Sequence, residues 1–126
     1  MNFPENLKYT KDHEWIRVEG NVGVVGITEY AQGELGDVVF VELPKIGTKV
    51  EAGQSFGTVE AVKAVSDLYS PVTGEVTDVN KEIQDSPELV NKESYERGWM
   101  IKIKIENSAE LNNLLDVEAY KKLIAK

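Results

Sequence analysis

Short runs of alternating apolar and polar residues, broken at close intervals by glycine or proline, constrain the fold of this chain more than any other feature. The clearest run, 99–105, places Trp99, Ile101, Ile103 and Ile105 on one side and Met100, Lys102 and Lys104 on the other. Residues 74–80 alternate similarly, and Gly20-Asn21 separates an alternating run at 13–19 from a second short run at 22–27, as a hairpin turn would. These patterns predict a mainly β fold.

Further short apolar runs extend the pattern. Residues 37–43 form a continuous β-branched run, which predicts a buried strand, and Pro44 and Gly47 then break the chain. Two more strands are expected at 49–50 and 55–56, on either side of a turn. Many short strands with frequent turns predict a β-sandwich or a flattened barrel.

Three segments predict peripheral helices. Thr28–Gly36 has a capping residue at its start and a glycine at its end. A second helix is expected to begin at 86–88, where proline takes the first helical position. Asp116 can cap a final helix over 116–126, whose apolar stripe and late basic residues suit a helix packed on a core. Asn80 is interpreted as a turn residue.

Charge and cysteine content narrow the classes of function. The 126 residues include 22 acidic and 14 basic side chains, which gives a net charge of −8. Nucleic acids and anionic membranes bind basic surfaces, so we expect neither as a partner. The absence of cysteine excludes disulfides, thiolate metal sites and cysteine nucleophiles, and a single histidine leaves little for a metal centre or a catalytic triad.

The length of the chain predicts one domain spanning residues 1–126. No apolar run approaches the roughly 20 residues of a membrane span. The first residues resemble neither a signal peptide nor a transit peptide. We therefore expect a cytoplasmic protein, with a mature organellar form as the alternative.

One lysine, Lys63, has an unusual setting. It is the only basic residue between Lys49 and Lys81, in a stretch of apolar, small and acidic residues. Such a lysine can be an ordinary solvated side chain, a Schiff-base nucleophile or the attachment point of a covalent group. A Schiff-base lysine needs a desolvated pocket or a second cation nearby, whereas an attachment point has to be exposed so that another enzyme can acylate it.

Two local structures around Lys63 are compatible with the sequence. Apolar residues recur at every third position here, and Glu60 would lie beside Lys63 on a helix. The β-branched composition and the break at Ser70-Pro71 instead favour a hairpin with strands near 55–60 and 65–69. The hairpin would place the lysine at its tip, although no Asn-Gly or Pro-Gly marks the turn.

Beyond these local patterns, the chain resembles the H proteins of the glycine cleavage system, which carry lipoate. The resemblance runs over nearly the whole length and rests on these motifs: Tyr9-Thr-Lys-Asp-His-Glu-Trp15, Gly26-Ile-Thr-Glu-Tyr-Ala-Gln32, Leu35-Gly-Asp-Val-Val-Phe-Val-Glu-Leu-Pro44, Val59-Glu-Ala-Val-Lys-Ala64, Ser66-Asp67, Pro71-Val-Thr-Gly-Glu-Val76, Val79-Asn80 and Gly98-Trp99. Each motif is short, but their order and spacing make the combination specific.

The resemblance implies a fold and an attachment site. The fold would be two antiparallel sheets of the lipoyl/biotinyl-carrier-like (hammerhead) type, with a lipoyl-like hairpin core at about 22–105 and a C-terminal helical segment at about 108–126. Lys63 would carry lipoate in amide linkage, and Glu60 and Gly74 would help modifying enzymes recognise it. Alanine precedes Val62 where the family more often has serine, and the absence of methionines beside the lysine argues against biotin.

The function that the resemblance implies is that of a carrier without catalytic activity of its own. The lipoyl arm would take an aminomethyl group from the glycine decarboxylase (P-protein) and deliver it to the aminomethyltransferase (T-protein). The dihydrolipoyl dehydrogenase (L-protein) would then reoxidise its dithiol. A lipoate ligase or an octanoyl/lipoyl transferase would load the lysine, and a monomer is the natural form of such a shuttle.

Two carboxylates in the matching motifs, Glu14 and Asp67, are candidates for holding the amine of the loaded arm by charge-assisted hydrogen bonds. The ordinary alternative is that both are solvated surface acids. Two other functions stay open at this point. One is an H-like relay that donates lipoyl groups to other lipoate-dependent complexes, and the other is an enzyme that uses Lys63 or a carboxylate pair directly.

Overall fold

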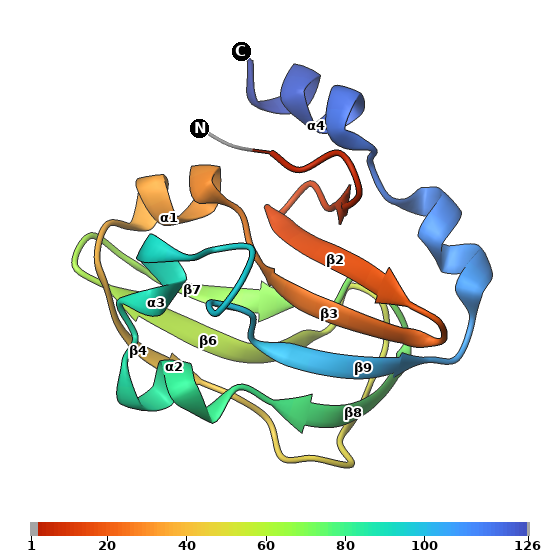
Figure 1. Cartoon of the computed structure of the whole chain (residues 1–126), viewed down its shortest axis with the longest axis horizontal. Coiled ribbons are helices and arrows are strands. Elements are labelled where there is room, and N and C mark those ends of the chain that lie inside the picture. The colour runs from red at the N-terminus through yellow and green to blue at the C-terminus, as the bar shows by residue number, and fades with distance from the viewer. Residues whose placement is uncertain (1–2, 126) are drawn as a thin grey trace.

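Two antiparallel β-sheets form a sandwich around the main apolar core of the protein (Figure 1). The computed structural model describes residues 3–125. The six-stranded sheet has the order β1 (Lys8–Tyr9), β2 (Glu14–Glu19), β3 (Val22–Ile27), β9 (Ile101–Ile105), β8 (Gly74–Val79) and β5 (Lys49–Val50). The three-stranded sheet has the order β4 (Val38–Glu42), β6 (Ser55–Ala61) and β7 (Val65–Tyr69). The predicted pair of antiparallel sheets is confirmed, as an open sandwich and not a closed barrel.

Apolar side chains from the inner faces of both sheets build the core. The larger sheet contributes Val25, Ile101 and Ile103, and the smaller sheet contributes Val41 and Val59. All five are at most 1% exposed, which is the burial expected of β-branched residues on facing strands. The core therefore fixes how the two sheets lie relative to each other.

Strand β4 differs from its predicted burial. Val38 and Val41 point into the core, but Val39 and Phe40 are 58% and 48% exposed. The pairing register with β6 shifts between Val38 and Phe40, which marks a β-bulge that turns two consecutive side chains outward. The prediction of a strand buried along its length at 37–43 is therefore wrong, because one face of β4 lies open to solvent.

The strand predicted over 99–105 begins at Ile101 in the structure, two residues later than predicted. Met100 precedes β9 and is buried in the main core, instead of facing outward with the lysines of the run. Its backbone N–H donates to the Val25 carbonyl at 2.7 Å, and its carbonyl accepts from Asn80 N at 3.0 Å. The period-two expectation fails there because the chain enters the sheet only at Ile101.

Short helices connect the strands and cover the ends of the sandwich (Figure 1). Helix α1 (Glu29–Leu35) is capped by Thr28 and ended by Gly36, as predicted. The sequence does not predict α2 (Lys81–Asp85), which Asn80 caps by accepting a hydrogen bond from Glu82 N at 3.1 Å. Asn80 therefore acts as a helix cap, and a five-residue helix is too short to leave a periodic pattern.

The remaining helical segments follow in the last third of the chain. Helix α3 (Leu89–Lys92) begins just after its predicted start, and the 3₁₀ segment η1 (Ser108–Asn113) leads to α4 (Val117–Ile124). Asp116 caps α4 as predicted, but the expected end at Lys126 lies outside the described residues. None of the helices within residues 3–125 is long and apolar enough to cross a membrane.

A second apolar cluster lies on the outer side of the larger sheet, beneath α4. Tyr120 of the helix is fully buried there, and its ring stacks on Tyr9 with 4.7 Å between centroids. Trp15 of β2 belongs to the same cluster. The chain before β2 and the chain after β9 are therefore held together at one end of the molecule.

Candidate functional site

Lys63 lies in the turn between β6 and β7. The hairpin prediction is confirmed and the helical alternative is wrong, because Glu60 pairs with Val65 and Ala61 N donates to the Ala64 carbonyl at 2.9 Å. Among residues 3–125, the one non-glycine residue with positive φ lies elsewhere, so this turn requires neither glycine nor asparagine.

The C-terminal end of α1 anchors the backbone of this turn. Val62 N donates to the Asp37 carbonyl and Lys63 N donates to the Leu35 carbonyl, each at 3.0 Å. Between these two acceptors, Gly36 adopts a φ of 84°, which favours glycine. The turn is therefore fixed by contacts outside its own hairpin.

The side chain of Lys63 remains exposed although its backbone is anchored. Its Nζ lies 3.4 Å from the Gly33 carbonyl, near the C-terminal end of α1, where a cation is favoured. Its Cγ would lie only 3.2 Å from a Cβ on Gly36, so the glycine leaves room for the lysine stem. The structure thus presents the amine from a fixed backbone without burying it.

Alternate residues of β7 form an outward-facing row that leads away from Lys63. Val65 and Asp67 are exposed and Tyr69 is half-buried, whereas Leu68 between them points into the core. The Tyr69 hydroxyl lies 3.5 Å from Asp67 Oδ2. From Val65 to Tyr69 the strand covers about 13 Å.

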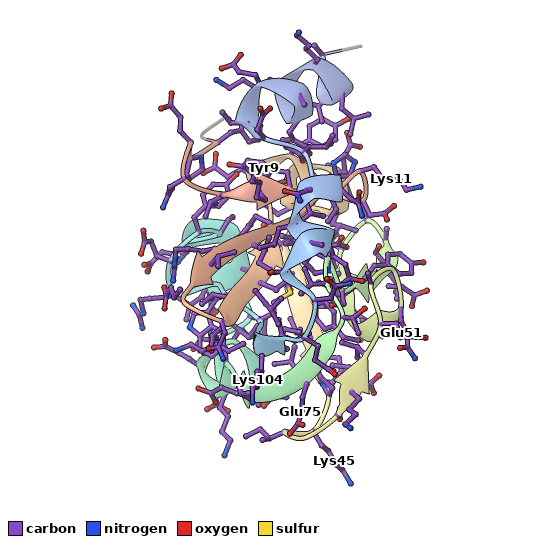
Figure 2. All side chains as sticks on the ribbon, turned by 90° about the vertical axis from the view of Figure 1, so that its right-hand side faces the viewer. Tyr9, Lys11, Lys45, Glu51, Glu75 and Lys104 are labelled. Atoms are coloured by element: carbon purple, nitrogen blue, oxygen red, sulfur yellow. The ribbon has the colours of Figure 1, made fainter. Side chains whose placement is uncertain are left out.

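A pocket of about 470 Å³ lies at the far end of this row. Four segments that are distant in the sequence contribute to its walls: 9–14, 52–53, 69–71 and 113–115. Lys11 and Glu51 point outward on the same side of the molecule, whereas Tyr9 lies further in, beneath the C-terminal helix (Figure 2). The pocket depends on the fold as a whole, so no local sequence pattern could predict it.

Glu14 lies in the wall of this pocket and is only 2% exposed. Its Oε1 accepts a hydrogen bond from Thr10 Oγ1 at 2.7 Å, and its Oε2 accepts one from Tyr69 N at 3.2 Å. Burial raises the pKa of Glu14 to about 7, although both hydrogen bonds act in the opposite direction. Glu14 is therefore not a solvated surface acid, whereas Asp67 is exposed.

The raised pKa of Glu14 predicts how stability depends on pH. A carboxyl group whose pKa is higher in the folded state stabilises the fold below pH 4.5, and this contribution is lost as pH rises through about 7. The difference between the two values corresponds to about 3 kcal/mol. We expect urea unfolding at pH 4 and pH 8 to show this loss in the native protein, and its absence in Glu14→Gln. Equal pH dependence of the two proteins would contradict the assignment.

One residue outside the matching motifs, Tyr120, packs against the pocket, because its ring stacks on Tyr9 of the pocket wall. The Tyr120 hydroxyl lies 2.9 Å from His13 Nδ1 and 2.8 Å from Thr28 Oγ1, and burial raises the pKa of Tyr120 to about 12. His13 adopts a φ of 71°, an uncommon backbone conformation for a residue with a side chain. The apolar stripe of the last helix predicts that Tyr120 is buried. Nothing in the sequence predicts that its hydroxyl contacts His13, the residue directly before Glu14.

The two predicted recognition residues lie in different settings. Glu60 is exposed on β6, opposite Phe40 and Val65. Gly74 is buried at the start of β8, where it pairs with Ile105 of β9 and Val50 of β5. A Cβ on Gly74 would lie 2.0 Å from the backbone oxygen of the neighbouring strand, so close packing alone requires glycine there.

Comparison with known proteins identifies the family. The sequence model of one family, described as "Glycine cleavage H-protein", matches residues 7–126. The chain belongs to this family. Two curated relatives, both named "Glycine cleavage system H protein", are each 57% identical to it. The relative from Carboxydothermus hydrogenoformans aligns over 96% of this chain and 93% of its own length, and that from Bacteroides fragilis over 98% of each.

A solved H-protein structure extends this likeness to three dimensions. The crystal structure of a glycine cleavage system H protein from Mycobacterium marinum matches with a TM-score of 0.90 at 36% sequence identity, over 98% of this chain and 100% of that chain. The family resemblance stated from the motifs is therefore confirmed over almost the whole H-protein chain, including both sheets and the hairpin between β6 and β7.

Proposed function

We propose that this H-protein is a lipoyl-bearing shuttle of the glycine cleavage system, with lipoate in amide linkage on Lys63. The observation that carries the proposal is an exposed lysine in a turn whose backbone is anchored to α1. An amine in this position is accessible to an acylating enzyme, and it lacks the desolvated setting that a Schiff-base lysine needs. The chain then acts as a single carrier domain over 1–126, a cytoplasmic monomer, and its partners supply the catalysis.

The residues along β7 suit the stowing of an arm attached to Lys63. When bound, the lipoyl group would supply a sulfur pair that accepts the aminomethyl group from the decarboxylase, yields it to the aminomethyltransferase and is reoxidised by the dehydrogenase. Val65 offers an apolar contact beside the turn, and Asp67 offers a carboxylate further along the row. The pocket at the end of the row is large enough for a small terminal group.

Glu14 would bind the amine at the end of a loaded arm. A cation placed against a buried carboxyl group favours its charged form, so amine binding and loss of the Glu14 proton would be coupled. The contacts to Thr10 and Tyr69 already orient both carboxyl oxygens, and the carboxyl group has little contact with water. Asp67 would act earlier on the same path, in a more hydrated position.

Removing either carboxylate should shorten the lifetime of the loaded arm. A hydrogen bond to a charged group contributes about 1.5–3 kcal/mol, so Glu14→Gln should release the aminomethyl group to water on the order of tenfold faster. Asp67→Asn should have a smaller effect, because its site is exposed. Ammonia release from the loaded protein, measured without the aminomethyltransferase, tests both variants. Unchanged rates in both would contradict a role for these carboxylates.

The attachment itself is tested by mass spectrometry. The purified protein is incubated with a lipoate ligase, lipoate and ATP, and its intact mass is then measured and its peptides are mapped. We expect one lipoyl addition, located on the peptide that contains Lys63. No addition, or an addition on another lysine, would overturn the proposal. The protein isolated from its own host should carry the same single modification.

A further inference from the structure

On the outer face of the β4–β6–β7 sheet, most side chains within the described residues 3–125 are exposed. Two rows of side chains cross this face from strand to strand. Phe40, Glu60 and Val65 form the row beside the Lys63 turn, and Glu42, Thr58 and Asp67 form the next row. Five of these six residues are exposed, and Thr58 is half-buried.

Exposed apolar side chains concentrate at the end of this face that carries Lys63. Val39 and Phe40 are 58% and 48% exposed, and Val62 and Val65 are 72% and 66% exposed. The bulge in β4 is what brings Val39 outward beside Phe40. Isolated exposed apolar residues need no explanation, but a group of them around one functional side chain marks a contact surface.

The acidic residues of the same face have no partner of opposite charge. Glu42, Glu60 and Asp67 form no salt bridge with any residue in the described range 3–125. Lys63 itself points to the α1 end, where its Nζ approaches the Gly33 carbonyl. The face therefore combines a group of apolar side chains with three uncompensated negative charges, and its chemical complement is an apolar surface bordered by lysine or arginine.

We infer that the outer face of the β4–β6–β7 sheet docks the enzyme that acylates Lys63, through an apolar patch bordered by basic residues on that enzyme. The inference rests on the proposed attachment of lipoate to Lys63. Val39 and Phe40 are the apolar anchors, and Glu42 with Glu60 supplies the charge that orients the partner.

The chemistry of the acylation requires contact on this part of the surface. Lipoate activated by ATP is an acyl adenylate. The deprotonated Nζ of Lys63 attacks its carbonyl carbon, the N–C bond forms, the C–O bond to the phosphate breaks, and AMP leaves. The nitrogen gives up two protons in total, and nothing is oxidised or reduced. The active site must therefore reach Nζ itself, so the enzyme must cover the surface beside the turn. A partner that acts at the far end of the arm need not touch it.

Substitution of the apolar anchors tests the docking surface. The variants are Val39→Ser and Phe40→Ser, and the matched control is Ile46→Ser, an apolar side chain that is 60% exposed. The start of β4 pairs with β6 beside the Lys63 turn, whereas Ile46 follows the other end of β4, after Glu42. In an assay with a lipoate ligase, lipoate and ATP, the protein is the varied substrate. The KM of the ligase for the Phe40→Ser protein should be about tenfold higher than for the native protein, and that for the Val39→Ser protein several-fold higher. The kcat should stay unchanged, and Ile46→Ser should match the native protein.

Charge reversal tests the second half of the inference. Glu42→Lys should raise the KM at low salt by about tenfold, and the difference should shrink as ionic strength increases. The control is Glu106→Lys, an exposed acid that follows β9 of the other sheet. Because all of the substituted residues are exposed, thermal unfolding of every variant should show native-like stability.

The outcomes separate this inference from the proposed function. If the native protein is not acylated at all, the proposed attachment fails and the docking inference fails with it. If the native protein is acylated and all variants have its KM, the carrier function stands and the docking inference is overturned. If only the reaction of the lipoylated protein with the decarboxylase weakens, the face belongs to that partner and the inference is likewise overturned.

Discussion

Replacing Lys63 with arginine should abolish lipoylation completely. Arginine keeps the positive charge and nearly the length of lysine, and its guanidinium can still approach the Gly33 carbonyl. It stays protonated in proteins and therefore offers no nucleophilic nitrogen. Because Lys63 is exposed, the free energy of unfolding should change by less than about 0.5 kcal/mol. Intact mass after incubation with a lipoate ligase, lipoate and ATP should therefore equal the unmodified mass.

The matched control is Lys45→Arg, at an exposed lysine that projects from the lower end of the molecule in Figure 2. It carries the same chemical change far from the β6–β7 turn and should be acylated like the native protein. Acylation of Lys63→Arg at another lysine would show that the turn does not select the site. Loss of acylation in Lys45→Arg would show that the assay reports something other than attachment at Lys63.

Replacing Gly74 with alanine should destabilise the protein by about 3 kcal/mol or more. The added Cβ would lie 2.0 Å from the Lys104 carbonyl oxygen and 2.9 Å from Ile103 Cγ1. Both neighbours belong to β9, and on the other side β5 pairs with Gly74, so β8 cannot shift without breaking backbone pairing. Urea unfolding followed by circular dichroism should show a much lower midpoint.

The control for Gly74→Ala is Gly33→Ala. Gly33 lies in α1, and a Cβ there would meet no atom within 4 Å. Because glycine in a helix is less favourable than alanine by roughly 0.5–1 kcal/mol, this variant should be slightly more stable than the native protein. Native-like stability of Gly74→Ala would contradict the packing argument. If such a stable variant were also acylated slowly, the proposed role of Gly74 in recognition would account for the glycine instead.

Local patterns predict those parts of the fold that local interactions determine. Thr28 and Gly36 define α1 correctly, because a helix cap and a left-handed terminal residue are properties of a few consecutive residues. The hairpin around Lys63 is likewise predicted from composition and the break after it. The chemical identity of the candidate attachment site therefore follows from the sequence, once the family resemblance is added.

The remaining features depend on contacts between distant segments. The bulge that exposes Val39 and Phe40 appears only in the register between β4 and β6. The burial of Glu14 requires walls from four separated segments, so its raised pKa has no signature in its own motif. The position of Tyr120 behind His13 depends on how α4 packs across the larger sheet. The spacing of apolar residues and the residues that cap helices carry no information about such long-range contacts.

The order of strands has a consequence for how the chain can fold during its synthesis. All three strands of the smaller sheet lie within residues 38–69, so the ribosome completes that set, with the Lys63 turn, near the middle of translation. The larger sheet cannot join β3 to β8 until the intervening β9 emerges, and residues 113–115 of the pocket wall come later still. A nascent chain thus carries the complete segment around Lys63, the proposed acceptor, before it can build the compartment that would shelter a loaded arm.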